Sequence, residues 1–306
     1  MSNPFAGIQD EKPLNGFRAR ARLLDDAKRG FMPMRKLFVQ RPAGSTVRAS
    51  VLADLVTGRH ERALDALLLL HALVPVLDDE KPFLLATWAR MLSTETTKWN
   101  TQTVSRAFDL LAEFKLVERE PRGRRVLVRP LREDGSGEEW THPGVGENVG
   151  KGYFTIPHDY WKSGLADRLA MPGKAMFLIM LAETTQKPTF SMAVERAPEW
   201  YGISERTAER GYKELRTQRT EIGQPVLLEH RQVVAEPRSP TGLRAVWHRA
   251  LENPYSMTAR GALQRATAAE SRAASIAGVV KAPAKKRLKR PAGQKAGRKV
   301  AEQGSA

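Results

Sequence analysis

Residues 201–216, YGISERTAERGYKELR, carry the clearest fold signal in this 306-residue chain. Ser204 is a strong candidate for a helix cap, because its side-chain oxygen can accept a free backbone amide of the first helical turn. After the cap, Ala208, Tyr212 and Leu215 recur at helical spacing, so we expect them to face a core together. The glycine before the cap predicts a tight turn, and the stretch as a whole predicts a helix that follows such a turn.

Around this stretch the sequence predicts a complete α+β unit. Its expected elements are an apolar helix at 173–183, a short helix at 194–201, the capped helix at 205–216, and a hairpin with strands at 226–230 and 245–248. The hairpin is indicated by the change from helical spacing to short runs rich in valine and leucine around a loop with proline and glycine.

The first half of the chain repeats this order. Helices are expected at 62–73, 84–91 and 102–114, and hairpin strands at 116–120 and 126–129. Either Asn100 or Thr101 supplies the cap of the third helix. Because the third-helix starts at Thr101 and Ser204 lie 103 residues apart, we expect a tandem repeat of one α+β unit.

Both capped helices resemble the recognition helix of winged helix-turn-helix domains. The first motif is NTQTVSRA at 100–107, followed by a basic hairpin, and the second is YGISERTAER at 201–210, which is the closer match. The resemblance implies an α+β fold of tandem winged-helix domains that bind double-stranded DNA, similar in architecture to plasmid replication initiators. Two features depart from the family pattern. Pro198 stands four residues before Gly202, where a small residue is usual, and the turn before the first motif is long.

Composition divides the chain into five expected segments. They are a basic N-terminal extension at 1–34, winged-helix domain 1 at 35–131, a glycine-rich linker at 132–151, winged-helix domain 2 at 152–256, and an Ala-rich and Lys/Arg-rich tail at 257–306. From 271 onward the tail holds ten basic residues, one acidic residue and no aromatic residue, so we expect most of it to be disordered. The basic stretch at 17–22 is compatible with a short helix or an extended arm.

The charge balance favours a polyanionic partner. The chain has 50 Lys and Arg residues against 34 Asp and Glu, a formal net charge of +16. It has no cysteine, which excludes disulfides and thiolate metal sites, and its six histidines never occur at ligand spacing, so we expect no metal and no cofactor. The longest apolar run, 66–77, is too short to span a membrane. These features predict a cytoplasmic protein, associated with the nucleoid or a plasmid.

The candidate DNA-contacting residues lie on the outward faces of the two capped helices and on the first hairpin turn. They are Thr101, Gln102, Ser105, Arg106, Arg122, Arg124, Arg125, Ser204, Arg206, Arg210 and Lys213. Gln102 is suited to an adenine edge and Arg106 to a guanine edge or a phosphate. In the second helix, Arg206, Arg210 and Lys213 form one basic stripe. An ordinary salt bridge from Glu209 to Lys213 is the alternative interpretation of that stripe.

Three functions are compatible with these features. A transcriptional regulator and a plasmid-type replication initiator would use the same DNA-binding parts, and the initiator resemblance also implies a homodimer. A winged-helix module that binds proteins or organises the nucleoid is the third, since acidic residues such as Asp109 and Glu205 on the outward faces would not hinder it. Catalysis is not expected, because the segment HDY at 158–160 lacks the paired metal-binding histidines that a strand-nicking tyrosine would need.

Overall fold

The computed structural model describes residues 13–42, 45, 48–144 and 152–276. The fold is mixed α+β, with 47% helix, 18% strand and small sheets, which confirms the expected class. The contacts divide the chain into a first compact unit that ends at Thr267 and a second unit that begins at Ala268. The basic segment 277–306, expected to be disordered, lies outside the described residues.

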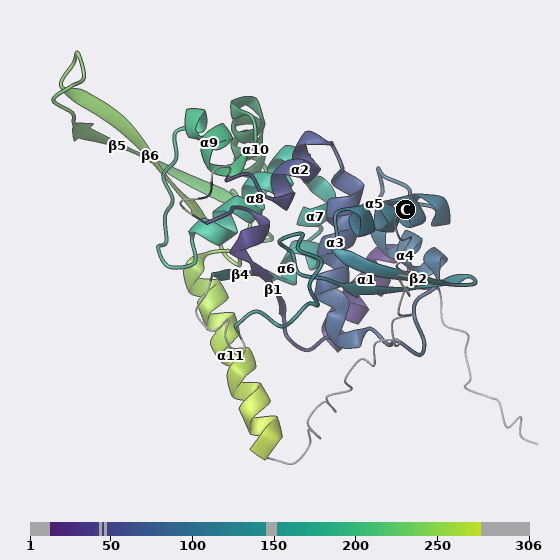
Figure 1. The fold of residues 1–306 in the computed structure, drawn as a ribbon. Helices are drawn as coiled ribbons and strands as arrows, with labels where there is room; N and C mark the ends of the chain where they lie inside the picture. The colour runs from purple at the N-terminus through teal and green to yellow at the C-terminus, as the bar shows by residue number, and fades with distance from the viewer. Residues whose placement is uncertain (1–12, 43–44, 46–47, 145–151, 277–306) are drawn as a thin grey trace, which may run out of the picture. The chain divides into compact units, whose positions relative to one another are not determined.

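The first half of the chain contains a strand, a series of helices and a hairpin (Figure 1). Its elements are α1 (Gly16–Asp26), β1 (Phe31–Arg35), η1 (Lys36–Phe38), α2 (Val51–Thr57), α3 (Glu61–Leu73), η2 (Val74–Val76), α4 (Leu85–Leu92), α5 (Thr101–Glu113), β2 (Val117–Arg122) and β3 (Arg125–Pro130). The stretch that was compatible with a helix or an arm is therefore a helix, α1.

The second half also contains a strand, a series of helices and a hairpin. Its elements are β4 (Tyr153–Pro157), α6 (Asp159–Lys162), α7 (Leu165–Arg168), α8 (Met171–Glu183), η4 (Val194–Arg196), α9 (Ala197–Tyr201), α10 (Glu205–Thr217), β5 (Leu227–Ala235), β6 (Leu243–Leu251) and α11 (Met257–Ile276). Within each half a single strand, β1 or β4, precedes a capped helix, α5 or α10, and a two-stranded antiparallel hairpin follows that helix.

The predicted caps and third helices are confirmed. Asn100 caps α5, because its Oδ1 accepts the backbone N–H of Thr103 at 2.8 Å, and this decides between the two predicted caps. Ser204 caps α10, with its Oγ accepting the N–H of Thr207 at 3.2 Å. The second hairpin is longer than predicted, since β5 and β6 each contain nine residues.

A pairing that the sequence did not predict joins the two halves. Strands β1 and β4 form an antiparallel pair, with Met34 opposite Phe154, and one hydrophobic cluster contains residues from both halves. Helix α8 is buried along almost its whole length, so it packs among other elements and not at a surface. The two predicted units therefore share one core.

Part of the predicted linker is packed into this unit. Glu133 is fully buried, and its carboxylate accepts hydrogen bonds from Arg35 Nη1 at 2.7 Å and Trp140 Nε1 at 3.1 Å. The described part, 132–144, therefore differs from an exposed glycine-rich linker, because a buried ion pair holds it in place. Residues 145–151 lie outside the described residues. Within the described part of the chain, no helix is long and apolar enough to cross a membrane.

Candidate nucleic-acid interface

Helix α10 is held in place by close packing against α8. A Cβ atom added at Gly211 would lie 2.3 Å from Met176 Cγ and 2.4 Å from the carbonyl oxygen of Pro172, so only glycine allows this approach. Glu214 of α10 accepts the backbone N–H of Gly173 at 3.0 Å, at the start of α8. These interactions fix which face of α10 points outward.

The turn before α10 also requires a glycine. Gly202 has a φ of +68°, and a Cβ there would lie 2.6 Å from the Cβ of Ala49, just before α2. Gln40 Nε2 donates to the carbonyl oxygen of Trp200 at 2.8 Å beside the same turn. Residues from the first half of the chain therefore position the start of α10.

The outward face of α10 carries unpaired positive charge. Arg206, Arg210 and Lys213 are exposed, and among the described residues none of the three side chains has a hydrogen-bond or ion-pair partner. Within the described part of the chain, Glu209 and Lys213 do not form the salt bridge that was the alternative interpretation of this stripe. The three cations are therefore free to meet an external anion.

An ion-pair network joins the β5–β6 hairpin to α10. Glu229 of β5 accepts from Arg216 of α10 at 2.9 Å and from Arg249 of β6 at 2.7 Å. The Arg249 guanidinium also lies 3.9 Å from the ring centroid of Tyr212 on α10 and donates to the carbonyl oxygen of Met192 at 3.0 Å. The base of the hairpin is thus fixed relative to the helix.

The hairpin extends the candidate interface away from the helices (Figure 1). Arg231 and Trp247 lie opposite each other, two residues beyond the Glu229–Arg249 pair and so on the same face of the hairpin as that pair. Arg231 is exposed and has no ion-pair partner among the described residues, and Trp247 is 44% exposed. A groove of about 400 Å³ runs between Trp247 and the α10 residues Arg210 and Lys213.

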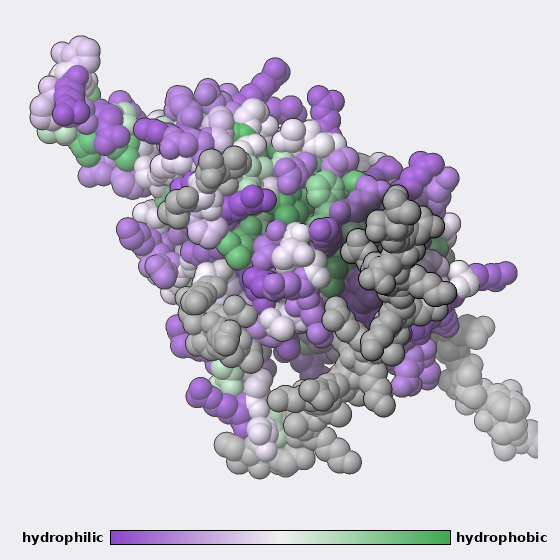
Figure 2. All heavy atoms as spheres, in the orientation of Figure 1, coloured by the Kyte–Doolittle hydropathy of each residue, from purple (hydrophilic) through white to green (hydrophobic). Residues whose placement is uncertain are grey.

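This hairpin surface was not predicted from the sequence. Arg231 and Trp247 were not candidates, because the predicted strand 226–230 stopped before Arg231 and nothing local pairs the two residues. The stretch 227–235, LLEHRQVVA, has no polar–apolar alternation, so no local pattern extends the predicted strand to Arg231. Figure 2 shows apolar side chains among polar ones on this hairpin, and the exposed apolar residues there include Val233 and Leu243.

The outward face of α5 is less free than that of α10. Thr101, Gln102 and Arg106 are exposed, as predicted. The side chain of Ser105 is engaged, since its Oγ accepts from Arg119 Nη2 of β2 at 2.8 Å, and Arg119 also pairs with Asp109. Ser105 was predicted to contact DNA, but here it helps to hold the first hairpin against its helix.

The basic turn of the first hairpin is also largely engaged within the protein. Arg122 forms an ion pair with Glu120 at 2.9 Å and donates to a backbone carbonyl at 2.8 Å. Arg125 donates to another backbone carbonyl at 2.7 Å. Of the three predicted arginines, only Arg124 has a guanidinium that makes neither a hydrogen bond nor an ion pair with a described residue, and it is exposed. Of the predicted DNA-contacting cations, Arg206, Arg210 and Lys213 are therefore unpaired on α10, and Arg106 and Arg124 are unpaired in the first half, within the described residues.

No protein-family model, curated protein or solved structure matches this chain. Within the described ranges, no cluster of three or more His, Asp or Glu side chains is arranged to hold a metal ion. Tyr160, the tyrosine of the HDY segment, is only 1% exposed, and burial raises its pKa well above the ordinary value. It is therefore not accessible to a duplex.

Proposed function

We propose that this protein binds double-stranded DNA through two winged-helix units, with α10 and the β5–β6 hairpin as the main DNA-binding surface. The observation that carries the proposal is the unpaired stripe of Arg206, Arg210 and Lys213 beside a hairpin that bears the unpaired Arg231. The net charge of +16 supports the same class of partner.

The geometry of a capped helix next to a hairpin suits duplex DNA. The major groove is about 12 Å wide and admits one α-helix. The N-terminus of α10 has a positive partial charge, which favours a nearby phosphate. In this arrangement Arg206 or Arg210 contacts a guanine edge, while Lys213 and Arg231 contact phosphates.

The two units have different roles in this proposal. The second unit contacts bases, and the first unit, with Ser105, Arg122 and Arg125 already engaged, supports it or mediates a homodimer. A dimer of this kind binds two half-sites in repeated or inverted DNA. A transcriptional regulator and a plasmid-type replication initiator both fit, and either would be associated with the nucleoid or a plasmid.

A protein-interaction module is the second candidate, because one specific feature favours it. Val233, Leu243 and Trp247 are large apolar side chains exposed on the long second hairpin. Exposed aromatic and aliphatic groups of this kind often form the centre of protein interfaces.

Fluorescence anisotropy with labelled duplexes, followed by selection from randomised duplexes, separates these functions. We expect Arg206→Ala or Arg210→Ala to relax base preference at one position by about 1–3 kcal/mol, because the variant can no longer bond a guanine edge with two nitrogen atoms. Lys213→Ala should lower affinity almost equally for all sequences. Arg122→Ala is the matched control, since its guanidinium is already paired with Glu120.

Two results would contradict the proposal. If no variant changes the sequence preference while Gln102→Ala and Arg106→Ala abolish it, the base-contacting unit is the first one. If the full chain shows no salt-sensitive binding to any duplex, DNA binding is wrong and the protein-interaction module remains.

A further inference from the structure

A second cleft lies apart from the α10 surface and is lined by charged and aromatic side chains. Its volume is about 530 Å³, within the range of small-molecule sites. It is lined by the start of α3, one side of α5, and residues of α1, α6, α7 and α8. Neither the proposed DNA-contacting stripe nor the second hairpin lines it.

Three arginines without acidic partners line this cleft. Arg59, Arg62 and Arg106 are exposed, and among the described residues none forms an ion pair. The Arg62 guanidinium lies 5.7 Å from the ring centroid of Trp99, which also lines the cleft. The cleft includes the N-terminus of α3, which has no side-chain cap. Free arginines and free backbone amides at one place favour a phosphate group.

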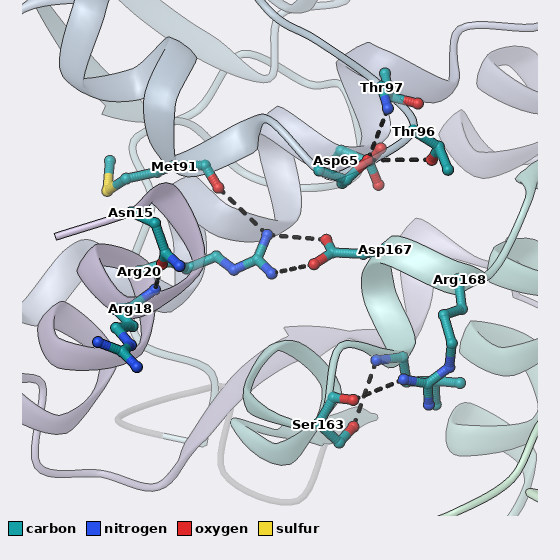
Figure 3. A network of polar contacts seen from close by, with 12 residues as sticks. Asn15, Arg18, Arg20, Asp65, Met91, Thr96, Thr97, Ser163, Asp167 and Arg168 are labelled. Atoms are coloured by element: carbon teal, nitrogen blue, oxygen red, sulfur yellow. Dashed lines mark hydrogen bonds and ion pairs between the residues drawn. The ribbon is translucent and has the colours of Figure 1, made fainter.

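The remaining charged groups of the cleft are paired. Lys174 is buried and donates to Glu61 and to Asp65, both at 2.8 Å. Arg20 of α1 reaches Asp167 of α7 with two nitrogen atoms, and Asp65 of α3 lies beside them in Figure 3. Arg20 balances Asp167, and Lys174 balances only one of the two carboxylates of Glu61 and Asp65. With the three arginines, the lining of the cleft keeps a net charge of +2.

One buried hydroxyl that lines the cleft has no partner. Tyr160 is 1% exposed, and its phenolic oxygen makes no hydrogen bond among the described residues. The ring is held by stacking on Phe177, with the centroids 5.1 Å apart, and by an edge contact to Trp161. An unsatisfied buried hydroxyl is costly, so a ligand oxygen that accepts from it would remove that cost.

We propose that this cleft binds a small phosphorylated molecule that carries hydroxyl groups. The phosphate lies against Arg59, Arg62 and Arg106 at the N-terminus of α3, and a hydroxyl or ring oxygen accepts the Tyr160 hydrogen bond. A nucleotide and a sugar phosphate share this chemistry. The site goes beyond the proposed DNA binding and does not rest on it, because the α10 stripe and the second hairpin do not line this cleft.

Isothermal titration calorimetry on the full chain tests the site with four probes: adenosine 5′-monophosphate, glucose 6-phosphate, inorganic phosphate and uncharged adenosine. We expect saturable binding of at least one organic phosphate, weaker binding of inorganic phosphate, and no binding of adenosine. Tighter binding of one of the two organic phosphates shows whether the site prefers a nucleotide or a sugar phosphate. No DNA is present, so the result is independent of the DNA-binding proposal.

Two variants and one control assign the binding to this cleft. Arg59→Ala combined with Arg62→Ala should abolish phosphate binding, while Arg90→Ala, an exposed arginine on α4, should not change it. Tyr160→Phe should weaken the organic phosphate about tenfold and leave inorganic phosphate unchanged, because only one hydrogen bond is removed. Since this hydroxyl has no partner, the thermal melt of Tyr160→Phe without ligand should match or exceed that of the wild type.

The proposal is overturned by any of three results. The first is that none of the phosphates binds saturably at millimolar concentration. The second is that the arginine double variant binds phosphate as the wild type does. The third is that Tyr160→Phe leaves the affinity for the organic phosphate unchanged.

Discussion

Replacing Glu229 by Gln tests the claim that its ion pairs with Arg249 of β6 and Arg216 of α10 hold the second hairpin against α10. Glu229 bonds to Arg249 at 2.7 Å, and Arg249 is only 8% exposed, so the substitution leaves a largely buried guanidinium without its counter-ion. Removing one partner of a buried pair costs about 3–5 kcal/mol. Arg249 keeps its interactions with Tyr212 and with the carbonyl of Met192, so we expect about 3 kcal/mol, the lower end of that range.

The same hairpin provides a matched control. Glu236 and Arg244 form an ion pair at 3.7 Å near the tip, where the Arg244 side chain is exposed. Such surface pairs contribute about 0–1 kcal/mol, so Glu236→Gln should change stability little. Differential scanning calorimetry should show a fall in Tm of roughly 6 °C for Glu229→Gln, since 1 kcal/mol shifts Tm by about 2 °C in a unit of this size.

The expected functional result is a decrease of DNA affinity in Glu229→Gln that exceeds the decrease in Glu236→Gln, because the hairpin is then no longer held beside α10. If the two variants have the same Tm, the Glu229 network does not fix the hairpin and the reasoning fails. A lower Tm with unchanged DNA affinity would separate the stability of the hairpin from its proposed role in DNA binding.

Three further predictions concern the tail, one buried histidine and one turn. Deleting 281–306 should weaken binding to all duplexes alike. In a salt titration, the slope of the logarithm of the DNA-binding constant against the logarithm of the salt concentration should become shallower by about 0.9 for each phosphate that the protein no longer neutralises. An unchanged slope would exclude the tail as a DNA-contacting arm. Burial lowers the pKa of His158 from 6.5 to about 4, so stability is complete above pH 6.5 and falls as the pH approaches 4. In urea unfolding, the loss of stability from pH 7 to pH 5 should be about 2 kcal/mol smaller in His158→Asn than in the wild type. Gly202→Ala should destabilise the protein by about 2 kcal/mol or more, because an L-residue is strained at φ +68° and its Cβ meets Ala49; Gly223→Ala, with a similar φ and open space, should cost less in a thermal melt.

Local sequence was enough to predict the two capped helices and the two hairpins, but not the strands β1 and β4 or the helices α2, α6 and α7. Cap residues and apolar spacing are properties of a few neighbouring residues, so the helices capped by Asn100 and Ser204 were predicted, with starts within one residue of those in the structure. Both hairpins were also located, because the change of apolar period is local. The α+β class followed from these elements.

How the halves join, and which charges stay free, depends on the whole fold. Strands β1 and β4 are short and have residues 36–152 between them, so no local pattern pairs them. The arginines of the first turn and of α10 look equally basic in sequence. Arg122 is paired and Arg210 is unpaired, because only the folded chain brings a carboxylate or carbonyl to one guanidinium and leaves the other facing solvent.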